Sequence, residues 1–235
     1  MPSPRSNDRR RQSALSGTPR TRLNRNKDRT VTDRAMLTEI LEQGMFCHLG
    51  VVVDGAPLVM PTAYGVDLSP TAPDAPDGTL YVHGSVAAKS LVASPEQTVC
   101  VTVTHVDGLV LARSGFHHSV NYRSAMVLAR PRLVTGDAKH HALDLIVEHL
   151  VPGRTTALRP PTRKDLAATT VLALPLTEVS VKMRSGAVSE EESDIGLPIW
   201  AGVMPLRMVA DPPQTSDDCA EPVPDHVLQR AADLA

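Results

Sequence analysis

A histidine, a serine and a lysine lie close together in the segment 80–90. His83 ends a short apolar run, Gly84-Ser85 forms a turn, and Lys89 follows within an expected helix. A turn of small residues at a helix start exposes backbone N–H groups, which suit an anionic group such as phosphate when a cation is nearby. Many strand-to-helix turns contain Gly and Ser and bind nothing. The segment therefore predicts an anion site only if its surroundings support one.

The two ionisable side chains of this segment each have a second interpretation. His83 could hydrogen-bond a cofactor or act as an acid or base, or it could be a barrel-rim histidine with its bonds made inside the protein. Lys89 could contact a phosphate or lie solvated on a helix surface. Spacing alone favours the structural interpretation of His83 and leaves that of Lys89 open.

A second group of donors, His117-His118 and then 121–124, precedes an expected strand. A metal site needs about three convergent ligands, often with a carboxylate. Adjacent histidines on an extended chain point to opposite sides, so we predict no metal site. His140-His141 and His149 are expected on the surface of an amphipathic helix. Trp200 could close over a planar ligand or pin the end of the chain to the barrel.

Several classes of protein lack support in this sequence. The G-x-S-x-G elbow, the Walker loop, the H-E-x-x-H motif and paired cysteines are all absent. Cys47, Cys100 and Cys219 are widely spaced and odd in number, which indicates neither a disulfide framework nor a zinc site. No signal-like segment or bilayer-length apolar stretch appears, so we expect a soluble cytoplasmic protein.

Charge and composition narrow the choice further. The net charge is -2, but the charges are unevenly distributed. Residues 1–34 contain ten Lys and Arg residues, and the segment after Gly186 contains ten Asp and Glu residues. The basic segment could touch nucleic acid, but a solvated tail explains it better, and we expect no nucleic-acid partner. Hydrophobic residues make up 42% and aromatic residues 3% of the 235, which predicts an aliphatic core in one sizeable domain with tails, or in two small domains.

Hydrophobic periodicity predicts the elements that would position these residues. A helix begins at the cap Asp33 and ends at Gly44, and a strand at 46–53 returns as 56–66 through an Asp54-Gly55 hairpin. Further strands are expected at 80–83, 98–105, 109–112, 122–135 and 171–183, and further helices at 86–92 and after Gly136. Asp107-Gly108 is interpreted as a second hairpin turn.

Antiparallel strands joined by hairpins, with helices between them, predict an α+β, mainly β fold with a closed or nearly closed barrel. The absence of βαβαβ alternation argues against a Rossmann-type domain. We expect residues 1–24 to be a disordered basic tail, 25–205 the barrel domain, and 206–235 an acidic, proline-containing tail.

Four stretches together resemble the pyridoxamine 5′-phosphate oxidase-like, FMN-binding split-barrel superfamily, and most closely its Nim-type (nitroimidazole-resistance) branch. They are RNKDRTVTD (25–33), CHLGVVVDGAPLVMPTAYGVD (47–67), DGTLYVHGSVAAKSL (77–91) and NYRSAMVLARPRLVTGDAKHHAL (121–143). Two features depart from that family. Lys89 stands where Arg is common, which keeps the charge but loses bidentate geometry, and the loop 67–78 is longer than usual.

The resemblance implies a six-stranded antiparallel split β-barrel that forms a homodimer, with FMN at the subunit interface. The cofactor contacts that it implies are Pro61, Thr62, Ala63 and Tyr64 at the isoalloxazine edge, His83 and Ser85 near the ribityl-phosphate, Lys89 on the phosphate, Ser124 on the flavin, and Arg123 and Trp200 as further candidates from the partner subunit. His83 also matches a histidine that Nim-type proteins place near bound ligand, which makes it the catalytic candidate.

The implied function is that of an FMN-dependent oxidoreductase, in which NAD(P)H supports reduction of a nitro, quinone or unsaturated small molecule. Pyridoxamine phosphate oxidation is less expected, because the Arg- and His-rich C-terminal segment of that enzyme is missing. Two alternatives stay open. One is a non-catalytic carrier or sensor of a cofactor or small molecule, and the other is the same barrel with F420 or haem, for which His83 or His118 would be the axial ligand.

Overall fold

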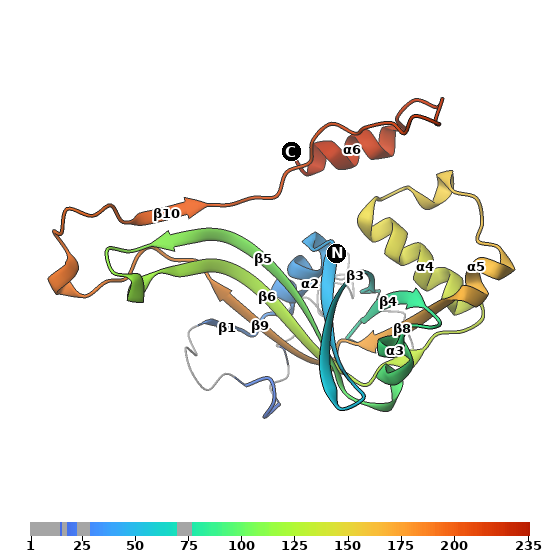
Figure 1. The fold of residues 1–235 in the computed structure, drawn as a ribbon, viewed down its shortest axis with the longest axis horizontal. Helices are drawn as coiled ribbons and strands as arrows, with labels where there is room; N and C mark the ends of the chain where they lie inside the picture. Colours follow the sequence, from blue (N-terminus) through green and yellow to red (C-terminus); the bar gives the residue numbers. More distant parts are fainter. Residues whose placement is uncertain (1–14, 16–17, 23–28, 70–76) are drawn as a thin grey trace, which may run out of the picture.

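The computed structural model describes residues 15, 18–22, 29–69 and 77–235, and the strands in these ranges join one antiparallel sheet (Figure 1). Its order is β1-β9-β6-β5-β2-β3-β4-β8-β7, and β10 pairs with β5 off this path. The strands are β1 (Thr30–Val31), β2 (Phe46–Val53), β3 (Ala56–Asp67), β4 (Thr79–Ser85), β5 (Val99–Leu111), β6 (Ser119–Ala129), β7 (Arg132–Leu133), β8 (Thr169–Pro175), β9 (Glu178–Arg184) and β10 (Gly202–Pro205).

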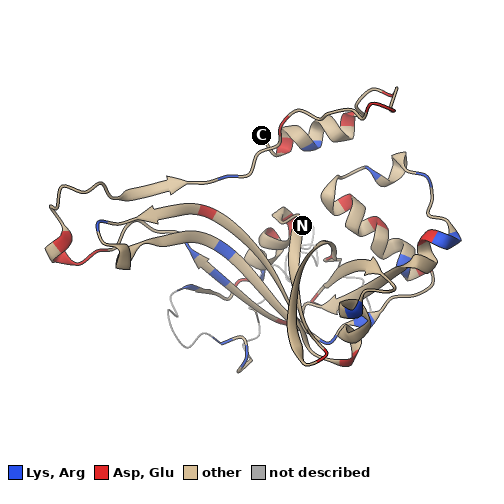
Figure 2. Cartoon of the chain, in the orientation of Figure 1, with Lys and Arg blue, Asp and Glu red and all other residues tan. Residues whose placement is uncertain are grey.

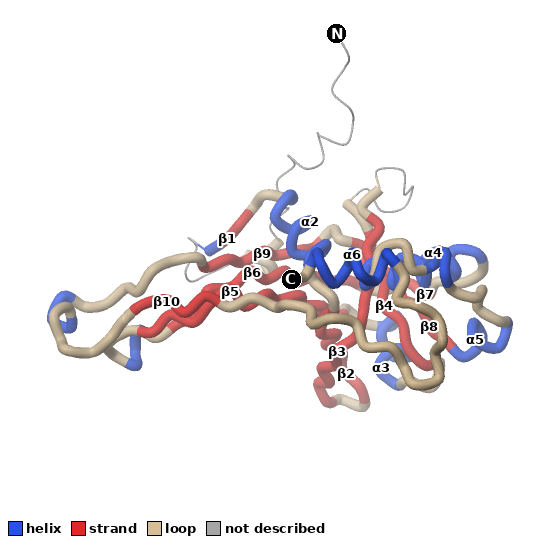
Figure 3. The backbone as a smooth tube through the Cα atoms, turned by 90° about the horizontal axis from the view of Figure 1, so that it is seen from above, coloured by secondary structure: helices blue, strands red, loops and turns tan. Residues whose placement is uncertain are grey.

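Helices flank this sheet, as Figure 3 shows from above. They are α2 (Arg34–Gln43), α3 (Lys89–Ala93), α4 (Asp137–Leu150), α5 (Arg163–Ala168) and α6 (Asp225–Asp233), with short 3₁₀ turns η2 (Ser94–Glu96), η3 (Gly115–His117), η4 (Thr155–Ala157) and η5 (Glu192–Asp194). None of the described helices is long and apolar enough to cross a membrane. The predicted α+β, mainly antiparallel β class is confirmed.

The sheet splits because β3 changes partner along its length. Its first part, up to Ala63, pairs with β2, and its second part, from Tyr64, pairs with β4. The Asp54-Gly55 turn that starts β3 has φ values of 51° and 78°, as a type I′ hairpin requires, so this predicted hairpin is confirmed. Strand β4 pairs with β8 along its whole length, and after Val82, the partner of Tyr64, it pairs with β8 alone. The result is the barrel-like split sheet that the sequence predicts.

The core is aliphatic, as the composition predicts. Leu37, Ile40 and Leu41 of α2 are at most 1% exposed and pack against buried valines and leucines of the strands. The helix begins at its predicted cap, where the side chain of Asp33 accepts a hydrogen bond from the Ala35 N–H. Burial of this apolar stripe fixes α2 against the sheet.

Helix α4 covers the other face of the split sheet, over β3, β4 and β8. The contact is closest at Gly65, where an added Cβ would lie 2.7 Å from the backbone of Leu145 and Ile146. Ala142 packs there in a small cluster with Val171 and Ala173 of β8. A glycine is therefore required for α4 to lie this close to β3.

Three sequence-based expectations were wrong. The expected strand 122–135 ends as β6 at Ala129, and β7 then pairs with β8 instead of continuing β6. Asp107-Gly108 is not a hairpin turn, because β5 runs on to Leu111 and absorbs these residues as an irregularity between Val106 and Gly108. The real turn between β5 and β6 lies at 112–118. The expected strand 171–183 is two strands, β8 and β9, separated at Leu176-Thr177, where the Leu176 N–H donates to the carbonyl oxygen of Gly78.

Residues 206–235, expected to be a tail, contain the helix α6. They follow β10, which pairs with β5, and α6 returns over the far end of α4 (Figures 1 and 3). The side chain of Arg230 donates to the carbonyl oxygen of Leu150 at 2.8 Å and so ties α6 to α4. Of the expected N-terminal tail 1–24, only residues 15 and 18–22 belong to the described part of the chain. Within 18–22, the side chains of Thr18 and Arg20 donate hydrogen bonds to the carboxylate of Glu178.

Candidate functional site

The point where β3 and β4 part leaves an unpaired stretch of strand edge. Pro61, Thr62 and Ala63 pair with β2 on one side, and the β3–β4 ladder begins only at Tyr64. The other side of this stretch has no strand partner among the described residues. The Thr62 hydroxyl reaches the His83 carbonyl oxygen across the gap at 3.5 Å, the limit of a hydrogen bond. Backbone groups at such an edge are available to a ligand.

His83 lies on β4 at this same point, and its ring Nδ1 is buried with no hydrogen-bond partner in the described structure. Burial lowers the pKa of His83 below its ordinary value of 6.5, so the ring is neutral at pH 7. A buried nitrogen without a partner costs free energy. Such an atom is expected where a bound molecule supplies the missing contact.

The predicted anion turn follows directly after His83, but its backbone donors are largely used inside the protein. The N–H of Val86 donates to Ala168, and those of Ala87 and Ala88 donate to the side-chain and carbonyl oxygens of Ser85. The Ser85 hydroxyl accepts one of these bonds and keeps its own hydrogen to donate. Helix α3 starts later than predicted and has five residues. An anion here would be held chiefly by side chains.

Lys89, the first residue of α3, reaches the tip of the β2–β3 hairpin. Its Nζ lies 3.3 Å from Oδ2 of Asp54, and both side chains are 79% exposed. An exposed ion pair of this kind contributes about 0–1 kcal/mol. Lys89 thus contacts the tip of the hairpin whose β3 strand carries the unpaired edge, and it is free to exchange its partner at little cost.

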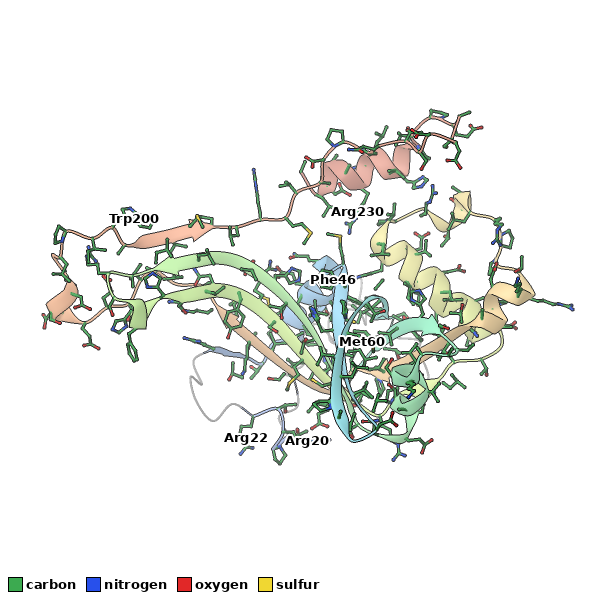
Figure 4. All side chains as sticks on the ribbon, viewed as in Figure 1. Arg20, Arg22, Phe46, Met60, Trp200 and Arg230 are labelled. Carbon is green, nitrogen blue, oxygen red and sulfur yellow. The ribbon has the colours of Figure 1, made fainter. Side chains whose placement is uncertain are left out.

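The side chains of four other predicted contacts are directed away from this point or lie elsewhere in the chain. Tyr64 is fully buried, and its hydroxyl donates to the carbonyl oxygens of Leu41 and Gly44, so its side chain is a core anchor. Arg123 pairs with Asp107 and Glu39 under α2. The remaining two are Ser124, which shares a hydrogen bond with Thr104, and Trp200, which lies at the far end of the β5–β6 arm (Figure 4).

The sequence analysis predicted the location of some histidines wrongly. His149 is not on the surface: its Nε2 lies 2.6 Å from the Gly44 carbonyl oxygen and its ring 4.5 Å from that of Tyr64. His118 is exposed at the tip of the β5–β6 arm, with Nδ1 on the Ser114 carbonyl oxygen. His226 on α6 has a buried, unpartnered Nε2 that no sequence signal indicated. Within the described residues no cluster of three metal-ligating side chains occurs.

Comparison with known proteins places this site in a family. The family model of pyridoxamine 5′-phosphate oxidase matches residues 33–183, which include the unpaired edge of β3, His83 and Lys89. The chain belongs to the pyridoxamine 5′-phosphate oxidase family. No curated protein matched it.

Solved structures extend the likeness beyond the family model. The flavocytochrome Anf3 from Azotobacter vinelandii is 32% identical, with a TM-score of 0.83, over 92% of this chain and 98% of its own. A FAD and haem binding protein from Mycobacterium smegmatis is 34% identical, with a TM-score of 0.78, over 86% of this chain and 97% of its own. A protein from Bacteroides thetaiotaomicron described in terms of 5-nitroimidazole antibiotic resistance is 21% identical over 65% of this chain and 85% of its own, with a TM-score of 0.52. It shares the fold.

Proposed function

We propose that this protein is a flavin-dependent redox protein with haem as a second cofactor. The observation that carries the proposal is the buried, unpartnered Nδ1 of His83 beside the unpaired edge of β3. A strand edge offers backbone donors and acceptors, which suit the polar rim of an isoalloxazine ring. The neutral imidazole offers either a hydrogen bond or a metal ligand.

The two relatives above 30% identity support both cofactors, since one is a flavocytochrome and the other a FAD and haem binding protein. The sequence alone led us to expect FMN. We now favour a flavin nucleotide without restricting it to FMN, and FAD is the form named for the second relative. F420 has no support from either relative.

The residues that would hold the flavin are those nearest the parting of β3 and β4. We assign the ring edge to Pro61, Thr62 and Ala63, and the phosphate to the side chains of Ser85 and Lys89. Ser85 keeps a hydroxyl hydrogen, and Lys89 is held only by an exposed ion pair. Of these groups, Lys89 supplies the charge.

A homodimer would complete this site. Phe46 and Val59, on the outward face of the β2–β3 hairpin, are 49% and 64% exposed, and apolar surface of this kind is typical of an interface. A partner subunit would then bring in the predicted contacts that lie far from His83 in one chain: Arg123, Ser124 and Trp200.

When bound, the flavin would supply the redox chemistry, taking electrons from NAD(P)H and giving them to haem or to a nitro, quinone or unsaturated small molecule. The protein's own residues orient the ring and exclude water from His83. Because burial keeps His83 neutral, its ring can hydrogen-bond a cofactor or ligate iron without first losing a proton. All three cysteines are free, which fits the reducing cytoplasm in which we place the protein.

Absorption spectroscopy of the purified protein tests the proposal. We expect twin flavin bands and a Soret band, mass spectrometry of the released cofactor to identify FMN or FAD, and bleaching of the flavin bands by NADPH or NADH. Protein that stays colourless after incubation with FMN, FAD and haemin would refute it. Cofactor binding without reduction by any pyridine nucleotide would favour the non-catalytic carrier.

The variant His83→Ala, compared with His118→Ala, separates the roles of the two candidate axial histidines. Loss of the Soret band with retained flavin assigns His83 to the iron, whereas loss of flavin assigns it to the flavin. Unchanged spectra in His83→Ala would remove it from the site.

A further inference from the structure

A short connection after β10 crosses from the β5–β6 arm to the C-terminal helix, and its side chains are mostly apolar. We call residues 206–210 the C-terminal strap. Leu206, Met208 and Val209 are 41%, 66% and 51% exposed, so these three apolar side chains bury little within one chain. Figure 2 shows how little charge this stretch carries, and Arg207 is the one charged residue from Ile195 to Ala210.

The strap is fixed at both ends. The Leu206 N–H donates to the Asp107 carbonyl oxygen at 3.0 Å, next to the last pair of the β10–β5 ladder. At the other end the Ala210 N–H donates to the Leu234 carbonyl oxygen at 3.1 Å, and α6 is itself tied to α4 by Arg230. Five residues held in this way form a bridge of up to about 17 Å between two parts of the fold, with exposed apolar side chains in its middle.

The strap runs from the end of β10 toward α6, along β5 and to one side of the strand end at which β2 begins (Figures 1 and 3). Figure 4 labels Phe46, the first residue of β2, below this segment. Phe46 is itself half exposed and contacts the ring of His48 edge to face, with centroids 5.5 Å apart. Apolar side chains are thus exposed both on the strap and at the start of β2, on the same side of the molecule.

The relatives indicate what these side chains cover. Residues 1–183, up to the end of the family match, are 183 of 235 or about 78% of the chain, so matches to 92% and 86% must include part of 184–235. Both of these relatives have haem or cytochrome in their names. In these two proteins, a match to part of the C-terminal extension thus occurs together with haem.

We propose that the C-terminal strap forms one wall of the haem site. A porphyrin is largely apolar, so Leu206, Met208 and Val209 suit its face or edge, whereas the polar edge of β3 suits a flavin. Because both ends of the strap are anchored on the protein, little chain entropy is lost when the ring binds against it. This inference rests on the proposed function, and it assigns haem and flavin to different parts of the chain.

Haem and flavin titrations on the full-length apoprotein test the inference. In the variant Leu206→Asn with Met208→Gln, of near-equal size and greater polarity, we expect haem to bind at least about tenfold more weakly, or about 1.4 kcal/mol, by Soret absorbance. Flavin affinity should stay within about twofold (~0.4 kcal/mol) of the wild type. Leu158→Asn is the matched control, since Leu158 is 43% exposed and lies in the α4–α5 connection, and it should leave both affinities unchanged.

Three outcomes would overturn the inference. Unchanged haem affinity in the strap variant removes the strap from the haem site while leaving the proposed function intact. Dissociation of a dimer with haem retained, measured by light scattering, shows that the strap covers a second copy of the chain instead. Wild-type protein that takes up flavin but no haem overturns this inference together with the haem part of the proposed function, and retains its flavin part.

Discussion

The ammonium group of Lys89 lies 3.3 Å from the carboxylate of Asp54, and this contact joins the start of α3 to the tip of the β2–β3 hairpin. Both side chains are largely exposed, so solvent screens the pair and either partner is replaceable. The lysine predicted to hold a phosphate is thus held in the folded protein by a carboxylate. A bound phosphate would have to compete with Asp54 for it.

Substitution of Lys89 should weaken flavin binding, whereas substitution of Asp54 should not weaken it. We expect Lys89→Ala to weaken binding by about 1–3 kcal/mol, the scale of a lost charge-assisted contact. Asp54→Asn should leave binding unchanged or strengthen it, because it removes the competing carboxylate and Asn tolerates the positive φ at this position. Flavin fluorescence titration measures both. Equal affinity in wild type and Lys89→Ala would exclude Lys89 from the site.

The Tyr64 hydroxyl should matter for stability more than for ligand binding. Its bonds to the carbonyl oxygens of Leu41 and Gly44, 2.7 and 3.0 Å long, tie β3 to the end of α2. Tyr64→Phe leaves these buried acceptors with one partner fewer and should lower the free energy of unfolding by about 1–3 kcal/mol in urea denaturation. Tyr122→Phe, whose hydroxyl has no partner in the described structure, should change it by less than about 0.5 kcal/mol. Similar losses in both would contradict this role.

Close packing of α4 on β3 predicts that a single methyl group at Gly65 is destabilising. The added Cβ would lie 2.7 Å from the backbone of α4, which cannot move aside as a side chain can. We expect Gly65→Ala to cost about 1–3 kcal/mol or more in thermal or urea unfolding. Gly115→Ala serves as the control, since nothing lies within 4 Å of its added Cβ. A stable Gly65→Ala protein would show that α4 packs less tightly than the structure has it.

Because two histidines are half-buried, we expect the free energy of unfolding to fall in mild acid. Burial lowers the pKa of His83 and of His149 below 6.5, so below that pH the unfolded chain binds more protons than the folded one. Their neutral forms favour folding fully above pH 6.5, and this advantage is lost as the pH falls toward the folded-state pKa values. The carboxyl groups with lowered pKa values, such as Glu148, titrate below 4.5 and therefore do not contribute to the change in stability in mild acid.

Urea midpoints should therefore decrease between pH 7.5 and pH 5.5. His149→Gln should flatten this dependence, and His140→Gln, at an exposed position of the same helix, should leave it as steep as in the wild type. A midpoint that is constant over this range in the wild type would contradict the burial of both rings.

Much of this fold follows from signals that lie within a few residues of one another. The Asp33 cap, the Gly44 end of α2, the Asp54-Gly55 hairpin and the amphipathic α4 were all predicted correctly, because capping, turn geometry and periodicity are local properties. The barrel and the strand with His83 followed from these elements taken together, whereas the family followed from the resemblance of four longer stretches of sequence to known members.

Contacts between distant residues decided the rest. Asp107-Gly108 has the sequence of a turn, but the Asp107 carboxylate pairs with Arg123 on the adjoining β6, so the strand continues through it. His149 is drawn from the expected surface into contact with Tyr64 and Gly44.

The sequence by itself determined that a histidine, a serine and a lysine follow one another at the end of a strand. Only the tertiary structure showed that β3 leaves β4 at that point and that the Nδ1 of His83 is buried there without a partner among the described residues. It alone also showed that an apolar strap is anchored at both ends between β5 and α6. The physical reason is that spacing along the chain fixes which groups are neighbours. Burial and missing partners depend instead on what other segments bring to the same place.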